Sequence, residues 1–438
     1  MVKISPEGVS LFLTNIRQSI VISNDYWLIY QKFNGIKDLY TIYIELSDEW
    51  DIDKEEMRKF ILFALDRKFM DLLDKPILNE IVLNGDPKTY YPSVISIELT
   101  NKCNIKCIYC YGYYHPHNKD IIEFDKLEEM LKFFHTNGSS IIEFTGGEPL
   151  LHPRFIEVCE LALVYFPSIT ILSNGALFTE GHFEIINNNI NRISLQISID
   201  GITEQTNHLV RGVPNTWLRT FNTIKRLIGM NAVVRIVYML TKINAHEVKA
   251  ACELMRSLGV KNGFSINPAM NIGRGHNSDC SIMNDIIIDK EYDALFEDIE
   301  KNYSDVLITI QKNNEKSVYF LKDEQKNCGA GWKTVGISAD GNVKACHLLD
   351  ENAIIGNIYT NNYKSIFSSH KTVNFFQKFQ KDTDDKRCEG CSFEGHCAKC
   401  IFKVYEANKR LLAEGRDLCP VAKENEMDVF LNFNEQVN

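Results

Sequence analysis

Three cysteines stand close together at Cys103, Cys107 and Cys110, in a Cys-x3-Cys-x2-Cys pattern. A structural zinc ion prefers four closed ligands, usually supplied as two Cys-x2-Cys pairs. An iron-sulfur cluster held by three cysteines instead leaves one iron open for another ligand. A zinc ion completed by a distant histidine such as His115 is the alternative. The pattern therefore indicates a metal centre and leaves its metal open.

A second group of seven cysteines occupies the region from 328 to 419. Its members are Cys328, Cys346, Cys388, Cys391, Cys397, Cys400 and Cys419. Asp340 and Gly341 predict a tight hairpin turn between "VGIS" and "VKAC", just before the second of these cysteines. Two Cys-x2-Cys pairs lie within the group, so a zinc ribbon is the alternative to iron-sulfur ligation here.

The elements that must position these cysteines show in the hydrophobic pattern. Six short apolar runs alternate with amphipathic stretches, which predicts a parallel (β/α)6 arrangement. The runs lie at 94–99, 140–147, 168–175, 192–200, 232–240 and 263–275. Cys159 and Cys252 fall on the apolar stripes of the intervening helices, so we expect them to be plain core residues.

Short polar motifs follow these strands, where the chemistry of a parallel barrel collects. The first cysteine group follows the first strand. The motifs after the other strands are Gly146-Gly147-Glu148, Ser173-Asn174-Gly175, Ser198 with Asp200, and Gly273-Arg274-Gly275. Their coincidence at one end of the predicted barrel indicates a single site.

The regions outside the barrel have different patterns. Residues 10–23 look like a hairpin, and helical patterns follow near 24–34, 37–46 and 53–72, so a small winged-helix-like domain is expected. After residue 275, an acidic amphipathic helix is expected near 284–303, leading to the second cysteine group.

Composition limits the function classes. The chain has 438 residues, 45% of them hydrophobic, enough for two or three packed units. A net charge of -10 without a basic stripe argues against nucleic acid as a partner. No signal peptide and no apolar run of roughly 20 residues is evident. Thirteen cysteines in so long a chain then fit a reducing cytoplasm.

With Tyr109 directly before the third cysteine, the first motif resembles that of the radical S-adenosylmethionine enzymes. The resemblance implies that the three thiolates hold a four-iron, four-sulfur cluster whose open iron binds the amino and carboxylate groups of S-adenosylmethionine. It implies that Gly146, Gly147 and Glu148 contact the methionine ammonium. The implied ribose and carboxylate contacts are Ser173, Asn174, Ser198 and Arg235. An ordinary strand-end turn is the alternative for the glycine motif, and a surface ion pair for the arginine.

Asp200 is the candidate catalytic residue. It could serve as a site acid, as a base or as a substrate contact. A plain turn residue before Gly201 is the alternative.

The seven later cysteines resemble the SPASM extension of the same enzymes, which implies two auxiliary clusters and therefore three four-iron clusters in all. Two residues separate Cys397 from Cys400, where the usual pattern has three. By resemblance Cys388, Cys391, Cys397 and Cys419 hold the outer cluster, and Cys328, Cys346 and Cys400 hold the one nearer the barrel. That cluster would have an open iron, because Thr334 stands where some relatives have a further cysteine. Cys280 or His347 could close it instead.

Stretches such as "NCGAGWKTVGISADGNVKACHLL" and "IIGNIY" are similar to sactipeptide and ranthipeptide maturases, which form thioether crosslinks. The resemblance implies a leader peptide recognition domain at 1–88, a radical barrel at 89–277, a bridging region at 278–325 and a SPASM domain at 326–438. It implies a 5'-deoxyadenosyl radical that attacks a precursor peptide, and an electron donor such as flavodoxin or ferredoxin. Another peptide modification, such as a carbon-carbon crosslink or a sulfatase-type residue oxidation, and a non-catalytic zinc scaffold are the alternatives.

Overall fold

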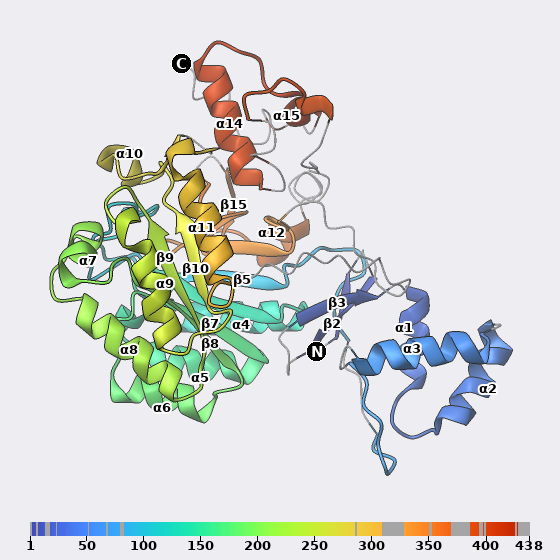
Figure 1. Ribbon diagram of the computed structural model, residues 1–438. Coiled ribbons are helices and arrows are strands. Elements are labelled where there is room, and N and C mark those ends of the chain that lie inside the picture. The colour runs from blue at the N-terminus through green and yellow to red at the C-terminus, as the bar shows by residue number, and fades with distance from the viewer. Residues whose placement is uncertain are drawn as a thin grey trace.

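A large α/β body carries a small amino-terminal domain on one side and the last helices of the chain above it (Figure 1). The computed structural model describes residues 2–5, 8–13, 18–22, 24–50, 52–66, 69–78, 83–284, 287–308, 328–349, 353–368, 386–393, 397, 400–424 and 427.

A nine-stranded sheet forms the centre of the body, in the order β10-β9-β8-β7-β6-β5-β13-β14-β15. Six neighbouring strands are parallel, which confirms the six predicted strands. They are β5 (Val94–Thr100), β6 (Ile141–Gly146), β7 (Ser168–Ser173), β8 (Ile193–Ser198), β9 (Val233–Leu240) and β10 (Phe264–Pro268). The connecting helices are α4 (Phe124–Thr136), α5 (Phe155–Tyr165), α6 (Glu180–Asn188), α7 (Glu204–Arg211), α8 (Trp217–Gly229) and α9 (Val248–Ser257).

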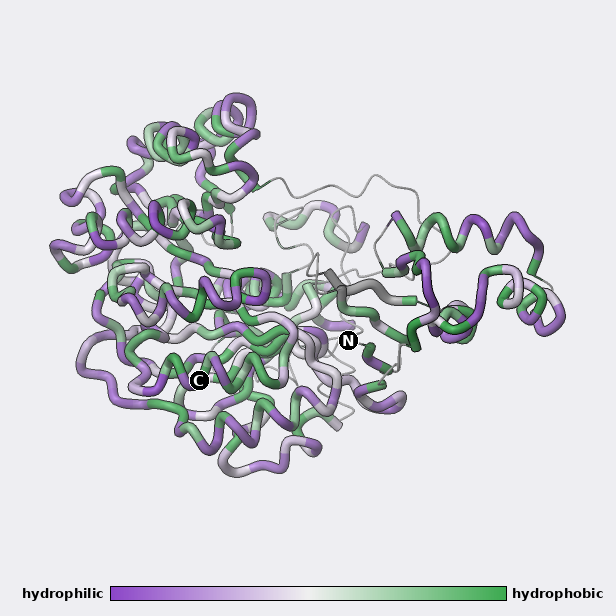
Figure 2. The backbone as a smooth tube through the Cα atoms, turned by 90° about the horizontal axis from the view of Figure 1, so that it is seen from below, coloured by the Kyte–Doolittle hydropathy of each residue, from purple (hydrophilic) through white to green (hydrophobic). Residues whose placement is uncertain are grey.

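Strand residues alternate between an apolar and a polar face. In β5, Ile95, Ile97 and Leu99 are fully buried in the core shared with the helices. Ser96 and Glu98 take the intervening positions, because successive strand side chains point to opposite faces. Hydrophobic and hydrophilic stretches likewise alternate along the helices (Figure 2). Cys159 and Cys252 are completely buried in this core, as predicted.

The carboxyl-terminal region continues the same sheet. Strand β13 (Thr334–Ile337) lies parallel to β5, with Thr334 opposite Val94, and pairs antiparallel with β14 (Asn342–Lys344). Gly341 has a φ of +87°, which suits the turn predicted between these two strands. The remaining elements here are β15 (Ile354–Asn357), α12 (Tyr363–Ser368), α14 (Ile401–Ala413) and α15 (Pro420–Glu424).

The amino-terminal domain combines a sheet of order β3-β2-β1-β4 with three helices. The expected hairpin is present, since β2 (Gly8–Leu13) and β3 (Gln18–Ile22) pair antiparallel, and β3 lies at the sheet edge. The other elements are β1 (Val2–Ser5), β4 (Leu83–Gly85), α1 (Asn24–Lys32), α2 (Leu39–Trp50) and α3 (Lys54–Asp66). The winged-helix assignment itself stays a prediction.

One buried lysine attaches this domain to the body. The Lys3 ammonium donates to the carbonyl of Tyr91 and, at 3.0 Å, to the Ser93 hydroxyl. Its side chain also covers Gly138, where an added Cβ would come within 2.6 Å of it. The contacts fall directly before β5, so the amino-terminal sheet is anchored beside the strand that leads to the first cysteine group.

The prediction of a helix at 284–303 is wrong for the first half of this range. Helix α11 begins at Asp293 and ends at Tyr303. Two short strands, β11 (Met283–Asn284) and β12 (Ile287–Ile288), form an antiparallel pair before it, and residues 290–292 form a 3-10 turn. The Asp289 carboxylate accepts from the Glu291 amide at the start of that turn, so the chain changes direction before the helix.

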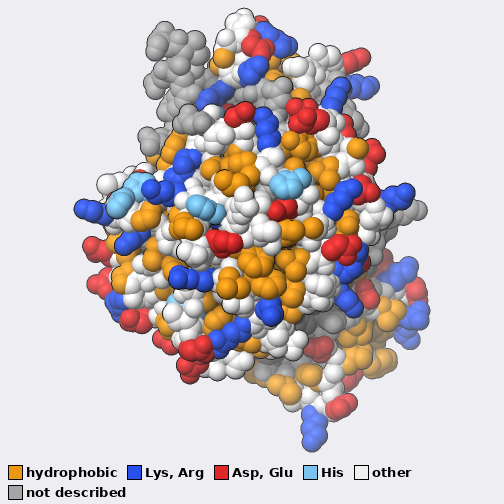
Figure 3. Space-filling model, turned by 60° about the vertical axis from the view of Figure 1, so that its left-hand side comes forward, with side chains coloured by type: hydrophobic (Ala, Val, Ile, Leu, Met, Phe, Trp, Pro, Cys, Tyr) orange, Lys and Arg blue, Asp and Glu red, His pale blue; other side chains and the backbone are white. Residues whose placement is uncertain are grey.

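No helix in the described part of the chain is long and apolar enough to cross a membrane. Over the face shown in Figure 3, basic and acidic side chains are intermixed around scattered hydrophobic ones.

Candidate functional site

The first cysteine group lies on a loop directly after β5, and two other elements hold this loop in place. The amides of Lys106 and Ile108 donate to the last carbonyls of α7, at 3.0 and 2.9 Å. Arg274, from the motif after β10, donates to the carbonyls of Cys107 at 2.8 Å and Tyr114 at 2.7 Å. The loop is therefore fixed by its attachment to β5, by the end of α7 and by Arg274 after β10.

The three thiols share one small buried cluster with Ile105 and Tyr114. Burial, followed by the nearby Glu148 and Cys107 charges, raises the pKa of Cys103, and burial raises that of Cys107 to about 12. Thiolates are the ligands of metal centres, so a positively charged centre would have to stabilise them here. Three cysteines on one loop suit an iron-sulfur cluster, in which each thiolate binds a different iron.

The zinc alternative lacks a compact ligand shell. Within the described ranges, no three Cys, His, Asp or Glu side chains meet as the ligands of one ion would. The His115 ring accepts a hydrogen bond from the His117 amide at 3.1 Å, so one of its nitrogens is already engaged locally.

The glycine motif packs against the cysteine loop. An added Cβ on Gly147 would lie 2.2 Å from the Lys102 carbonyl oxygen, so only glycine fits this close approach. Glu148 is fully buried and accepts hydrogen bonds from the Ser173 hydroxyl and the Asn174 amide, both at 2.8 Å. Burial nevertheless raises its pKa to about 7.

Two of the expected ribose and carboxylate contacts have protein partners in this structure, and their role as cofactor contacts stays a prediction. The Ser173 hydroxyl is committed to Glu148, and the Asn174 side chain donates to the Asn104 oxygen at 2.8 Å, on the cysteine loop. Both residues orient the loop and the carboxylate. Ser198 ends β8 and is partly exposed.

Arg235 lies apart from the carboxyl ends of the strands. It is the third residue of β9, it is exposed, and its guanidinium donates to the Ser265 hydroxyl at 2.9 Å. It lines a cavity of about 300 Å³ together with Glu143 and Gln196. Its role as a cofactor contact stays a prediction.

Asp200 is a fully buried hub. One carboxylate oxygen accepts from the Tyr109 hydroxyl at 2.6 Å and the Arg211 guanidinium at 2.8 Å. The other accepts from the Met239 amide at 2.9 Å. Both carboxylate oxygens are engaged and the side chain has no exposed surface, so Asp200 positions these neighbours in this structure. It joins β8, β9 and α7 to the cysteine loop through Tyr109. Its expected role as an acid, a base or a substrate contact stays a prediction.

Sequence reasoning missed Arg211. The side chain is 1% exposed and contacts Asp200 and the Asn174 carbonyl, yet its Nη2 atom has no hydrogen-bond partner. A buried guanidinium donor without an acceptor is costly, so the arrangement suits an anionic ligand group at this point. The position of Arg211 in the helix could have indicated its burial, because Asn207, one turn earlier, and Val210, directly before it, are also buried.

The seven later cysteines form two neighbourhoods. Charges on Cys328 and Cys400 act on Cys346, whose pKa burial raises to about 11. The other four line a separate cavity of about 270 Å³, and they are Cys388, Cys391, Cys397 and Cys419. The Asn408 amide and the Ala422 backbone amide point at the sulfur of the last of these, at 3.4 and 3.3 Å. The assignment of each set to its own cluster stays a prediction.

The two residues considered as extra ligands have other roles. The His347 ring places one nitrogen 3.2 Å from the Ser96 carbonyl and the other 3.1 Å from Glu98, so neither nitrogen is free for iron. Cys280 is buried beside Ser278, whose hydroxyl donates to its sulfur at 2.9 Å. Whether either residue closes the cluster nearer the barrel stays a prediction.

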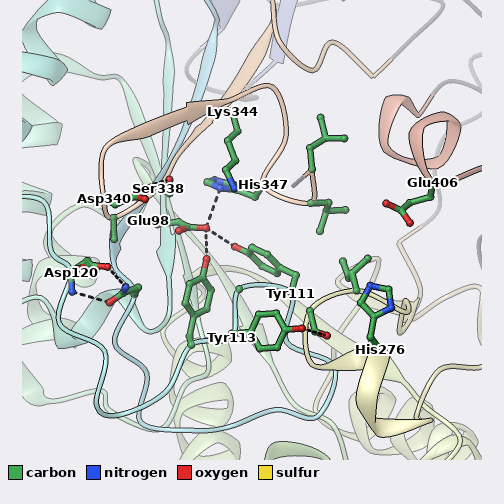
Figure 4. A pocket seen from close by; sticks show the side chains of 18 of the residues that line it. Glu98, Tyr111, Tyr113, Asp120, His276, Ser338, Asp340, Lys344, His347 and Glu406 are labelled. Atoms are coloured by element: carbon green, nitrogen blue, oxygen red, sulfur yellow. Dashed lines mark hydrogen bonds and ion pairs between the residues drawn. The ribbon is translucent and has the colours of Figure 1, made fainter. Parts of the chain in front are cut away.

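A cavity of about 490 Å³ lies between the two cysteine regions (Figure 4). Its walls come from the cysteine loop, the β13–β14 hairpin, the turn after β10 and α14. They include Glu98, Tyr111, Tyr113, His276, Lys344, His347 and Glu406. The cavity has room for several side chains of a bound peptide, and its wall carries both acidic and basic groups.

Comparison with known proteins identifies two parts of the chain. The radical SAM superfamily model matches residues 97–268, and the SPASM iron-sulfur cluster-binding domain model matches residues 328–392. The antilisterial bacteriocin subtilosin biosynthesis protein AlbA of Bacillus subtilis is 26% identical, over 97% of this chain and 94% of its own length. The sporulation killing factor maturation protein SkfB of the same organism is 26% identical, over 76% and 74%.

Solved structures share the fold. Streptococcus suis SuiB bound to its precursor peptide SuiA gives a TM-score of 0.65 at 14% identity, covering 92% of this chain and 95% of that one. The enzyme anSMEcpe with bound AdoMet gives 0.55 at 18% identity, covering 79% and 100%. The family matches therefore show a radical SAM domain at residues 97–268, which holds the first cysteine group, and a SPASM domain at residues 328–392, and the chain is similar to the sactipeptide maturases.

Proposed function

We propose that the protein forms sulfur-to-carbon thioether crosslinks in a ribosomally made precursor peptide. One observation carries the proposal: a cavity of about 490 Å³ is lined both by Tyr111, which directly follows Cys110, and by His347, which directly follows Cys346. A peptide held there would meet the radical chemistry on one side and auxiliary iron on the other. The names of AlbA and SkfB, which concern peptide biosynthesis and maturation, support this choice of substrate.

The bound groups supply the reactivity and the protein supplies position. When bound, a four-iron cluster and S-adenosylmethionine provide a 5'-deoxyadenosyl radical, which takes a hydrogen atom from a peptide carbon. In the proposal, Cys103, Cys107 and Cys110 hold that cluster. With the cofactor bound, the unpaired donor of Arg211 would suit its carboxylate, and Glu148 would suit its methionine amine. Asp200 keeps Arg211 and Tyr109 in place.

Bond formation leaves an electron to be removed. A peptide thiolate that joins the carbon radical completes the carbon-sulfur bond with one electron in excess, and iron-sulfur clusters of the SPASM region are the proposed acceptor. In the proposal Cys328, Cys346 and Cys400 hold the cluster nearer the barrel, and the other four SPASM cysteines hold the outer one. A flavodoxin or ferredoxin is the proposed source of the electron that starts each cycle.

The amino-terminal domain is the proposed leader-binding part. Its strand β3 lies at a sheet edge, where an extended peptide can add by backbone pairing. SuiB, which shares the fold, was solved with its precursor peptide. A different peptide modification, such as a carbon-carbon crosslink, would use the same cavity and clusters, so the mass of the product peptide distinguishes these reactions.

Replacing Cys103, Cys107 and Cys110 together by Ala should abolish formation of 5'-deoxyadenosine from S-adenosylmethionine and dithionite, because no open iron then remains. Iron should fall from about 12 to about 8 per chain, since the auxiliary clusters stay. Cys159→Ala, a core cysteine, is the matched control and should keep both values. Continued 5'-deoxyadenosine formation in the triple variant would reject the assignment.

Deleting residues 1–88 should weaken binding of the full precursor by at least roughly tenfold, because backbone pairing to the edge strand carries affinity in this mode. Uncoupled cleavage of S-adenosylmethionine should continue in the truncated enzyme. Fluorescence anisotropy with labelled precursor measures the affinity, and a peptide without its leader is the control. Equal affinity in both enzymes would contradict leader binding by this domain.

The buried position of Glu148 predicts a pH dependence of the metal-free protein. Its pKa of about 7 exceeds the ordinary value of 4.5, so the stabilisation belongs to the protonated form and is lost between about pH 4.5 and 7 as the pH rises. Relative to Glu148→Gln, the free energy of unfolding should fall by on the order of 2 kcal/mol over this range. Urea unfolding at several pH values measures it, and parallel profiles for the two proteins would show that Glu148 is not desolvated.

A further inference from the structure

Three hydrogen-bond donors converge on a single oxygen of Glu98 (Figure 4). The Tyr111 hydroxyl donates at 3.0 Å, the Tyr114 hydroxyl makes a short bond, and the His347 Nδ1 lies 3.1 Å away. Glu98 is 4% exposed. Burial acts to raise its pKa, but the histidine and the two tyrosines outweigh burial and lower it below the ordinary value. The charged form is thus the one that this environment favours.

The donors come from two separate cysteine regions. Tyr111 directly follows Cys110 of the barrel loop, and His347 directly follows Cys346 of the auxiliary group. Glu98 itself belongs to β5. One carboxylate therefore links the neighbours of two proposed cluster ligands across the wall of the central cavity.

The surroundings leave His347 and Tyr111 little freedom. The second His347 nitrogen lies 3.2 Å from the Ser96 carbonyl, and an added Cβ on Gly336 would come within 2.7 Å of the ring. The Tyr111 ring packs edge-on against Tyr114 at 5.6 Å between centroids and lies 6.3 Å from the His347 ring. Packing and hydrogen bonds together fix both side chains, as a positioning shell requires.

We propose that Glu98 is a positioning residue that fixes the barrel cysteine loop relative to the auxiliary cysteine loop, and so sets the geometry of the peptide cavity between them. The inference rests on the proposed function, because it assumes that both loops carry clusters. A buried carboxylate with three donors is costly to disrupt, since each donor would be left without its charged partner. Its removal should release both loops at once.

Two variants separate charge from hydrogen bonding. Glu98→Gln keeps a carbonyl acceptor for the tyrosines, whereas Glu98→Leu removes every acceptor at similar size. Glu247→Leu is the matched control, because Glu247 is a buried glutamate that also accepts two hydrogen bonds, from Ile202 and Thr206, and neither donor belongs to a cysteine region. All three proteins would be reconstituted with iron and sulfide next to the wild type.

The readouts are the electron paramagnetic resonance spectra and midpoint potentials of the reduced clusters, and amide hydrogen exchange. In Glu98→Leu we expect altered signals from both the barrel cluster and the auxiliary cluster nearer the barrel. Exchange should also rise by at least roughly tenfold in the cysteine loop and in the β13–β14 hairpin. Glu98→Gln should lie close to the wild type, and Glu247→Leu should change neither spectra nor exchange at these places.

The outcomes distinguish the inference from the function. Wild-type protein without any cluster signal would overturn the proposed function itself. Normal wild-type spectra, with Glu98→Leu unchanged in signals and in exchange, would overturn the role of Glu98 alone. Should Glu98→Leu fail to fold, the double variant Tyr111→Phe with Tyr114→Phe removes two of the three donors and tests the same point with the same readouts.

Discussion

Strand β5 is hydrogen-bonded along both of its edges, to β6 on one side and to β13 on the other. A strand paired on both sides cannot shift its register without breaking two ladders, and a slip of one residue would also exchange its apolar and polar faces. The cysteine loop begins where this strand ends, and Glu98 faces the cavity from it. The contacts of Lys3 with Tyr91 and Ser93 fall just before it. The amino-terminal domain, the barrel and the carboxyl-terminal region are thus all positioned by contacts with β5 or with the residues just before it.

Buried charge is concentrated around the site. Asp200 with Arg211, Glu98 with its three donors, and Glu148 with Ser173 are all removed from solvent. Replacing a buried ion pair by apolar residues is often neutral or favourable, so stability alone is a weak reason for keeping one. Each of these groups instead holds a residue of the cysteine loop or its surroundings. Burying these charged groups costs folding free energy, which is consistent with a site that requires fixed side-chain positions more than it requires a stable fold.

The sequence predicted those parts of the molecule that local pattern determines. The six parallel strands, the turn at Gly341 and the burial of Cys159 and Cys252 follow from alternation, turn chemistry and helical period. The helix expected from 284 failed because its first half pairs as two short strands, and tertiary contacts outweigh an amphipathic pattern in so short a segment. The proposed division of the seven cysteines between two clusters comes from the family resemblance, because spacing alone gives many pairings.

Side-chain partners across the fold could not be read from the sequence. The resemblance gave Ser173 and Asn174 as cofactor contacts, and it did not predict that their side chains contact Glu148 and Asn104, from other loops. Arg211 was hidden in an ordinary helix, and Asp200 had two equal interpretations until its three donors were seen. Such partners depend on which elements meet in space, and that information lies in the topology.

The pairing of β13 with β5 also has a consequence for synthesis of the chain. Thr334 lies opposite Val94, so one edge of β5 stays unpaired until the ribosome has synthesised β13, roughly 240 residues later. At elongation rates of about 5–20 residues per second, that interval is on the order of 10–50 seconds. During it the barrel presents an unpaired, apolar-backed strand edge, a known template for association between nascent chains. Chaperone supply during translation should then limit the yield of soluble protein.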